Sequence, residues 1–338
     1  MLVSWNVTKR CNLYCEHCYR DSGPEASLEG QLTTEEGRRL MDQIKEAGFR
    51  LLIFSGGEPL IRGDLTELVA YAASIGLKPA IGSNGTLLTA AKARELRDAG
   101  LGGIAISIDS ADPAAHNRFR HAAEGWEKAV EGIRHAQAAG LKVQINMTLK
   151  EDNVDDFEQV AQLAEELNVA SLHPFFLVPT GRAVHMEEEA LKHERYYMVL
   201  RKVLQKQQGT RIEIKPTCAP QFMPLAKTMN MEMRYTRGCL AGVAYCSVLP
   251  DGDVHICPYL PVKVGNVRET SFADIWRNHP VFQDLRNFQK YEGSCGSCPD
   301  VGTCGGCRAR SFYYSGGNFL AEEPWCHKRP PARKVMEG

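Results

Sequence analysis

Hydrophobic and polar positions alternate regularly up to about residue 205, where short apolar runs are separated by longer amphipathic segments. The apolar runs are typical of strands, and they are Leu2–Thr8, Leu51–Ser55, Lys78–Ser83, Gly103–Ile108, Lys142–Met147 and Ser171–Leu177. The amphipathic segments have the period of a helix, and they are Thr34–Ala47, Leu65–Ile75, Ala90–Ala99, Gly125–Ala139, Val154–Leu167 and a stretch near Glu189–Gln207. Six strand–helix units predict an α/β fold with a parallel sheet.

Signals at the helix ends support this pattern. The first helix is preceded by Thr33-Thr-Glu-Glu36, which has the spacing of a capping box, and Gly48 follows its last turn. Six units are too few to close an eight-stranded barrel. We therefore expect a partial (β/α)6 TIM-like barrel over residues 1–210, open on one side.

The pattern changes after about Lys215, where turns become frequent and cysteines replace apolar residues. Such a segment has little hydrophobic material to fold alone, so bound metal is its expected source of stability. We expect a linker over 211–238, a small cysteine-rich domain over 239–330 and a tail over 331–338.

Charge and hydropathy exclude some classes of function. Forty basic residues stand against 41 acidic ones, a net charge of −1, so the balance does not favour a nucleic-acid partner. The first residues show no signal peptide, and no apolar run approaches the roughly 20 residues that span a membrane. We expect a cytoplasmic protein with no membrane partner.

The twelve cysteines are unevenly distributed. Cys11, Cys15 and Cys18 lie near the start, and the other nine lie between Cys218 and Cys326. Since a reducing compartment disfavours disulfides, this distribution predicts two metal-binding regions. The first offers three thiolates on a short loop, which would leave one iron of a four-iron cluster open. A zinc site with a distant fourth ligand, such as His17 or His116, is the alternative.

The loop Cys11-Asn-Leu-Tyr-Cys15-Glu-His-Cys18 resembles the cysteine motif of the radical S-adenosylmethionine (SAM) superfamily. His17 stands where an aromatic residue is usual. The second strand ends in Gly56-Gly57-Glu58-Pro59, which resembles the Gly-Gly-Glu-Pro motif of that superfamily. The resemblance implies that this turn binds the SAM amino group through its backbone and the Glu58 carboxylate, and that SAM is cleaved to a 5′-deoxyadenosyl radical.

The same resemblance implies further SAM contacts at the ends of later strands. The candidates are Ser83, Asn84, Ser107, Asp109, Asn146, Val178 and Arg182. Ligands bind at the carboxyl ends of parallel strands, which agrees with these positions. Each of these residues could instead be an ordinary loop residue or helix cap.

The C-terminal cysteines resemble a SPASM domain, a module that binds auxiliary 4Fe–4S clusters. A zinc ribbon is disfavoured because only five residues separate Cys298 from Cys304, whereas its knuckles are roughly 15–20 apart. The resemblance implies one or two auxiliary clusters, with ligand sets Cys239, Cys246, Cys257 and Cys307, and Cys295, Cys298, Cys304 and Cys326. The pair Cys304-Gly-Gly-Cys307 is one residue shorter than usual, and Cys218 is extra; we expect Cys218 to be a spare thiol.

SPASM-bearing enzymes act on peptides, sulfatases or tetrapyrroles. About ten residues precede Cys11, which leaves no room for an N-terminal peptide-recognition domain, and Pro258 stands where sulfatase-maturing enzymes place an acidic base. Ser4-Trp-Asn-Val-Thr-Lys-Arg-Cys11 and Phe175-Phe-Leu-Val-Pro-Thr-Gly-Arg182 resemble the haem and haem d1 biosynthesis branch. That branch includes the alternative-pathway haem synthase, which converts two propionates of iron-coproporphyrin III to vinyls. Relatives that act on didecarboxysirohaem or a haem d1 precursor, and peptide maturases, remain alternatives.

A tetrapyrrole substrate would need cations for its propionates. Candidates near strand ends are Arg20, Arg118, Arg120 and Arg182, and candidate axial histidines are His116, His121 and His173. A low-potential electron donor of the flavodoxin or ferredoxin type is implied. An iron–sulfur electron-transfer protein is the non-enzymatic alternative, although it would need neither an open cluster site nor the Gly-Gly-Glu-Pro turn.

Overall fold

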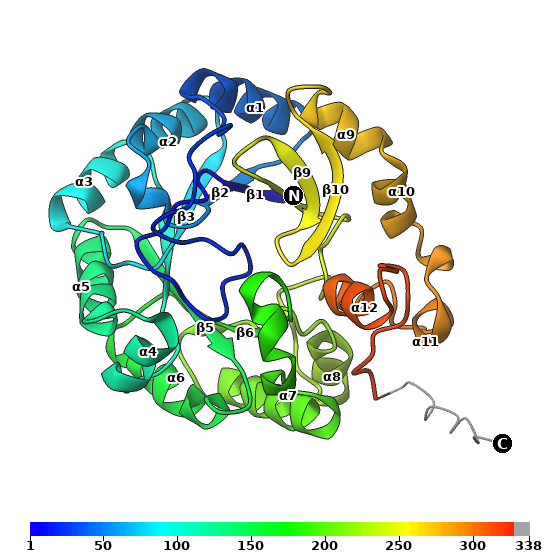
Figure 1. Cartoon of the computed structure of the whole chain (residues 1–338). Coiled ribbons are helices and arrows are strands. Elements are labelled where there is room, and N and C mark those ends of the chain that lie inside the picture. The colour runs from blue at the N-terminus through cyan, green and yellow to red at the C-terminus, as the bar shows by residue number, and fades with distance from the viewer. Residues whose placement is uncertain (328–338) are drawn as a thin grey trace.

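The computed structural model describes residues 1–327, and their strands form one ten-stranded sheet in the order β10-β9-β8-β1-β2-β3-β4-β5-β6-β7. The sheet curves into an incomplete barrel with helices around its outside (Figure 1). The strands are β1 Leu2–Asn6, β2 Leu51–Ser55, β3 Lys78–Ser83, β4 Gly103–Ser107, β5 Lys142–Leu149, β6 Ser171–Phe176, β7 Glu213–Ile214, β8 Tyr245–Val248, β9 Asp253–Cys257 and β10 Leu260–Asn266.

Helices connect successive parallel strands and cover the outer face of the sheet (Figure 1). The α-helices are α1 Thr34–Glu46, α2 Leu65–Ser74, α3 Ala90–Asp98, α4 Pro113–Arg120, α5 Gly125–Ala138, α6 Phe157–Glu166, α7 His193–Gln208, α8 Phe222–Thr228, α9 Phe272–Asn278, α10 Pro280–Arg286, α11 Gly293–Gly296 and α12 Arg308–Tyr314. Short 3₁₀ helices are η1 Pro59–Ile61, η2 Val154–Asp156, η3 Gly181–Glu189 and η4 Phe288–Lys290.

The two faces of the sheet differ in chemistry. Side chains of a strand alternate between the faces, and the outward set, such as Val3 and Trp5 of β1, is fully buried against the helices. Gly37 of α1 lies so close to the Trp5 ring that an added Cβ would be 2.4 Å from it. The inward set includes polar residues such as Ser4 and Asn6, so the barrel interior is polar and its outer layer is the apolar core.

The C-terminal strands extend the barrel sheet. Strand β8 pairs in parallel with β1, and β9 and β10 follow as an antiparallel extension. The segment 211–238, expected as a linker, carries β7 and α8. Strands β7 and β10 are therefore the two edges of one sheet, and α12 lies near the gap between them (Figure 1).

The six predicted strands and their helices are confirmed, with ends that differ by no more than a few residues. The capping box is present, since Thr33 and Glu36 each accept a hydrogen bond from the other's backbone. Helix α4 was not predicted, and it lies between Asp109 and the next predicted helix. Within residues 1–327 no helix is long and apolar enough to cross a membrane. The expected tail, 331–338, lies outside the described residues.

Candidate functional site

The three N-terminal cysteines lie on the loop that follows β1. Backbone amides face two of the sulfurs, because Leu13 N donates to Cys11 Sγ at 3.4 Å and Ser22 N donates to Cys18 Sγ at 3.3 Å. Such donors stabilise thiolates bound to iron. Burial raises the pKa of Cys11 to about 12, so cluster binding must displace its proton. This donor set of three sulfurs fits a cluster with one open iron.

The Gly-Gly turn after β2 lies directly against the start of the cysteine loop. Gly57 N donates to Thr8 O at 2.8 Å, and Glu58 N donates to Arg10 O at 2.9 Å. A Cβ on Gly57 would lie 2.2 Å from Arg10 O, and Gly56 has φ +149. Only glycine allows this backbone-to-backbone contact. The turn therefore fixes the cysteine loop relative to the end of β2.

We expect Gly57→Ala to weaken SAM binding by roughly fivefold to 150-fold, because the added methyl must displace the Arg10 backbone at a cost of roughly 1–3 kcal/mol. Gly63→Ala is the matched control, since nothing lies within 4 Å of its added Cβ. Equilibrium dialysis of anaerobically reconstituted protein with labelled SAM measures both. Equal affinities of the two variants would contradict the role given to the turn.

Glu58 joins the ends of β2 and β3. Its carboxylate is fully buried and accepts hydrogen bonds from Ser83 Oγ at 2.8 Å, Asn84 N at 2.8 Å and Leu60 N at 3.1 Å. Burial raises the pKa of Glu58 to about 7, although these donors act against the shift. Both oxygens are thus bound within the protein. The neighbouring Pro59 is also buried and begins η1.

Asn84 continues this link to the cysteine loop. Its Nδ2 lies 3.8 Å from Cys11 Sγ and donates to Asn12 Oδ1 at 2.9 Å. The side chain of Asn12 in turn donates to Thr86 Oγ1 at 2.8 Å. The end of β3 therefore contacts both the first cysteine and the residue after it.

A buried ion pair lies beside the second cysteine. Arg120, at the end of α4, donates to Asp109 Oδ2, and its Nη1 lies 3.9 Å from Cys15 Sγ. Although burial acts the other way, the guanidinium holds the pKa of Asp109 well below its usual range. Thr148 N donates to the other Asp109 oxygen at 2.8 Å. Asp109 thus positions the Arg120 guanidinium next to the Cys15 sulfur.

His17 occupies the place of the usual aromatic residue, and its ring packs as an aromatic side chain would. Its ring stacks on Phe119 with centroids 4.2 Å apart and an interplanar angle of 17°. Burial, together with Arg120, lowers the pKa of His17 to about 3, so the ring is neutral. Because its Nε2 lies 3.5 Å from Arg120 Nη2, the same guanidinium contacts both the loop and its aromatic support.

Arg182 holds the cysteine loop from the other side. Its guanidinium donates to Cys15 O at 2.9 Å, to Ser22 O at 2.8 Å and to Asp21 Oδ1 at 2.7 Å. It also lies 3.7 Å from the centroid of the Tyr14 ring. These contacts place Arg182 against the loop backbone. The sequence predicts that Arg182 binds a carboxylate of SAM or of a propionate. Such a carboxylate would have to bind a guanidinium that already donates to three acceptors.

The remaining predicted positions fall into two groups. Ser107, Asn146 and His173 are paired in register on β4, β5 and β6, so their side chains share the inward face of the barrel. Val178 is buried after β6. In contrast, Arg118 is exposed, and His121 is half exposed and paired with Glu16 at 2.9 Å. His116 is buried and accepts from Asp109 N at 3.2 Å.

Arg20 extends from the cysteine loop to the inward face of β8. Its Nη2 donates to Ser247 Oγ at 3.2 Å, and its Cζ lies 5.4 Å from the Tyr19 ring centroid. Among the described residues, its buried Nε has no hydrogen-bond partner, and neither does the side chain of Asn6. The interior therefore presents a cation and unsatisfied polar atoms to a ligand.

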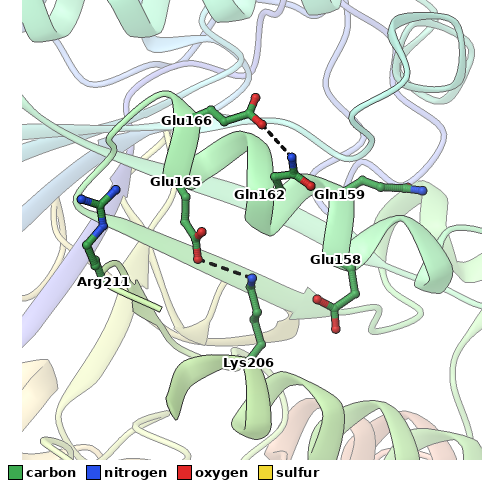
Figure 2. Close-up of a pocket in the computed structure, with 7 residues that line it drawn as sticks. All are labelled: Glu158, Gln159, Gln162, Glu165, Glu166, Lys206 and Arg211. Carbon is green, nitrogen blue, oxygen red and sulfur yellow. Dashed lines mark hydrogen bonds and ion pairs between the residues drawn. The ribbon is translucent and has the colours of Figure 1, made fainter. Parts of the chain in front are cut away.

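A separate groove lies outside the barrel. Figure 2 shows its lining residues on α6, α7 and the segment before β7, with Glu165 facing Lys206 at 3.4 Å. Its side chains are polar and solvated, and it is remote from the cysteine loop. We assign it no part in the site. Among residues 1–327 no three His, Cys, Asp or Glu side chains converge as they would around a single metal ion.

Family comparisons match both cysteine regions. Residues 5–164 match the Radical SAM superfamily, and residues 239–299 match the SPASM iron–sulfur cluster-binding domain. The chain belongs to the radical SAM superfamily: it is an enzyme that uses SAM and 4Fe–4S clusters and carries a SPASM domain.

Relatives match over nearly the full length. The AdoMet-dependent heme synthase of Oleidesulfovibrio alaskensis is 38% identical over 99% of this chain and 89% of its own. The AdoMet-dependent heme synthase of Methanosarcina barkeri is 38% identical over 97% of both chains. The pre-heme d1 synthase of Dinoroseobacter shibae is 30% identical over 96% of this chain and 86% of its own. The predicted resemblance to this branch is confirmed.

Solved structures support the fold. SuiB of Streptococcus suis superposes with a TM-score of 0.72 and 15% identity over 92% of this chain and 74% of its own. The structure of anSMEcpe with bound AdoMet superposes with a TM-score of 0.72 and 17% identity over 97% of this chain and 90% of its own. At such identities the likeness concerns the fold alone.

Two parts of the site were missed by the sequence interpretation. Arg120 was considered only as a propionate partner, because α4 was not predicted and its end could not be placed beside Cys15. Asn12 has no motif of its own, and only the fold brings it to Asn84. For Asn12, the one signal in the sequence is that it is a polar residue directly after Cys11.

Proposed function

We propose that this enzyme decarboxylates two propionates of iron-coproporphyrin III oxidatively and so forms the two vinyl groups of haem b. The observation that carries the proposal is the position of Arg20, a cation of the cysteine loop that extends into a polar barrel interior. The heme synthases that are 38% identical support the same reaction.

The reaction has a simple balance. Each propionate loses one hydrogen atom from its β-carbon, then carbon dioxide and one electron, which leaves a carbon–carbon double bond. When bound, the iron–sulfur clusters supply one-electron chemistry, which cleaves SAM to methionine and a 5′-deoxyadenosyl radical and takes up the electron from the substrate. A low-potential donor of the flavodoxin or ferredoxin type would start each cycle.

The chain's own residues bind and orient the reactants. We propose that the backbone of Gly56 and Gly57 holds the SAM amino group, because the Glu58 side chain is occupied by the end of β3. Ser107 and Asn146 on the inward face would contact the rest of SAM. Asp109 and Arg182 would act through the loop, the first by positioning Arg120 and the second by its three acceptors on that loop.

Two cations would bind the substrate carboxylates. Arg20 lies on one wall with Ser247, and Lys215 follows β7 close to the inward His173. Lys215 is half-buried with its Nζ 4.2 Å from the centroid of the Tyr235 ring, and burial lowers the pKa of its ammonium, so a carboxylate partner would be favourable there. Arg118 is exposed and plays no part in this arrangement.

We expect Arg20→Gln to raise the KM for iron-coproporphyrin III tenfold to a hundredfold, because a charged hydrogen bond contributes about 1.5–3 kcal/mol. Arg118→Gln, which removes an exposed arginine, is the control and should keep the wild-type KM. SAM cleavage without substrate separates binding from cluster damage. The site assignment fails if Arg20→Gln leaves the KM unchanged.

The assay is anaerobic incubation of reconstituted protein with SAM, reductant and iron-coproporphyrin III, followed by mass analysis of the tetrapyrrole. The proposal predicts stepwise loss of two carboxyl groups with 5′-deoxyadenosine formed alongside. Deoxyadenosine without tetrapyrrole change would overturn the proposed substrate. Didecarboxysirohaem and a haem d1 precursor would then be tested, and peptides after them.

A further inference from the structure

Either Cys218 or Cys246 could be the fourth ligand of the first auxiliary cluster. The SPASM resemblance assigns Cys246 to the first auxiliary cluster and leaves Cys218 spare, but the fold places these two thiols differently. Cys246 is fully buried on β8, where it is in register with Val3 of β1. Val3 and Cys246 share the outward, apolar face of the sheet, toward the helices.

The pairing of β8 fixes this orientation. Tyr245 and Ser247, on either side of Cys246, point inward: Tyr245 Oη donates to Ser4 Oγ at 2.9 Å, and Ser247 Oγ accepts from Arg20 at 3.2 Å. A one-residue slip of β8 would be needed to turn Cys246 inward, and it would move every side chain of the strand to the wrong face.

Cys257 lies on the opposite face from Cys246. His255 of β9 is in register with Ser247, so it points inward, and Cys257 is two residues further along the same strand. The sheet itself therefore separates Cys246 from Cys257. One cluster cannot bind both without rearrangement of β8.

Cys218 is a candidate for the ligand position that Cys246 cannot fill. The chain before it extends the β7 edge, since Thr217 N donates to Pro174 O at 2.8 Å and Thr217 O accepts from Phe176 N at 3.0 Å. Cys218 then takes a left-handed conformation with φ +57, and its carbonyl accepts a hydrogen bond from Arg310. This turn directs the chain away from the strand.

Hydrogen bonds connect the Cys218 turn to the segment of Cys307. Arg310, which donates to the Cys218 carbonyl, also donates to Glu323 Oε1 at 2.9 Å, and the Glu323 carboxylate accepts from Cys307 N. Cys239 joins the same segment, because Cys239 N donates to Cys304 O at 2.9 Å. Cys218, Cys239 and Cys307 are therefore held in one region by hydrogen bonds of their own backbone, and Cys257 faces the same inward side of the sheet.

We propose that the first auxiliary cluster is bound by four thiolates of which Cys218 is one and Cys246 is not: Cys218, Cys239, Cys257 and Cys307. Cys218 comes from the β7 edge of the sheet and Cys257 from β9, beside the other edge. The cluster therefore joins the two edges across the opening of the barrel. This proposal rests on the SPASM assignment and is independent of the substrate.

The experiment compares Cys218→Ser with Cys246→Val in a background in which Cys11, Cys15 and Cys18 are alanine, so that only auxiliary iron remains. We expect Cys218→Ser to lose about four irons per chain or to keep a cluster with one oxygen-ligated iron, which Mössbauer spectra of 57Fe-reconstituted protein distinguish. Cys246→Val fills the same apolar space and should keep the parent's iron content and spectrum.

The opposite pattern, iron loss or oxygen ligation with a Cys246 variant and an unchanged Cys218→Ser, would overturn the proposal. An unchanged spectrum in both variants would overturn it equally. Cys246→Ser is the second variant, because it keeps a ligand oxygen: if Cys246 binds iron, this variant alone gives an oxygen-ligated signal. Since iron is counted without SAM or tetrapyrrole, failure here is distinct from failure of the proposed function.

Discussion

Cys15→Ala is expected to reduce SAM cleavage to background while leaving the auxiliary iron in place. Cys15 is a central residue of the cysteine loop, with Arg120 3.9 Å from its sulfur and Arg182 bonded to its carbonyl. Removal of its sulfur leaves two ligands for a cluster that needs three. The auxiliary cysteines lie on other segments, so the auxiliary clusters keep all of their thiolate ligands. The measurement is 5′-deoxyadenosine formation under reducing, oxygen-free conditions, with iron counted on the same sample.

Cys246→Val is the matched control, since it replaces a buried cysteine of the outer face that binds no cluster in our account. It should cleave SAM at the rate of the wild type. If SAM cleavage survived Cys15→Ala, the loop would not hold the catalytic cluster, and the non-enzymatic interpretation of these cysteines would have to be reconsidered.

Glu323→Gln is expected to destabilise the C-terminal part of the chain by about 3–5 kcal/mol, because it leaves a buried guanidinium without its counter-ion. Arg310 and Glu323 are 0% and 1% exposed and are joined by two hydrogen bonds, at 2.9 and 3.2 Å. Denaturant unfolding under anaerobic conditions, followed by circular dichroism and by loss of cluster absorption, measures the effect.

The position of this ion pair explains why its loss should also release iron. Glu323 accepts from Cys307 N and its own amide donates to Cys295 Sγ at 3.3 Å, while Arg310 donates to the carbonyl of Cys218. The pair thus contacts cysteines of both auxiliary groups. A cluster ligand on either side loses its backbone support when the pair is broken.

Two variants act as controls for this prediction. Glu67→Gln breaks the exposed pair with Arg38, whose side chains are 37% and 52% exposed, and should cost no more than about 1 kcal/mol. The double change Arg310→Met with Glu323→Leu removes both charges and should be less destabilising than Glu323→Gln alone. Equal effects of Glu323→Gln and Glu67→Gln would contradict the structural role of the buried pair.

The barrel could be predicted because its signals are local. Apolar runs, helical periods and caps such as Thr33 each depend on a few neighbouring residues, and they located all six strand–helix units. Helix α4 was missed because its pattern is short and directly follows the Asp109 loop. The pairing of β8 with β1 joins residues more than 240 positions apart, for which a single sequence carries no local signal.

Within the site, too, contacts between distant segments determine what the sequence alone does not show. Spacing singles out the cysteines as candidate ligands, but whether Cys246 points inward depends on the register of β8, which spacing does not reveal. The role of Arg182 also depends on the fold, because only the fold shows that its guanidinium is hydrogen-bonded to the backbone of the cysteine loop. Sequence motifs thus identified the chemistry, and tertiary contacts determined which side chains bind and which position.

In the proposed reaction, the barrel interior directs a radical to the β-carbon of a tetrapyrrole propionate. The most direct test uses iron-coproporphyrin III with deuterium at the propionate β-carbons, incubated with SAM and reductant, and mass analysis of the 5′-deoxyadenosine. Our account predicts that deuterium is transferred into 5′-deoxyadenosine as carbon dioxide is lost and vinyl groups appear. Unlabelled 5′-deoxyadenosine together with an unchanged tetrapyrrole would contradict it.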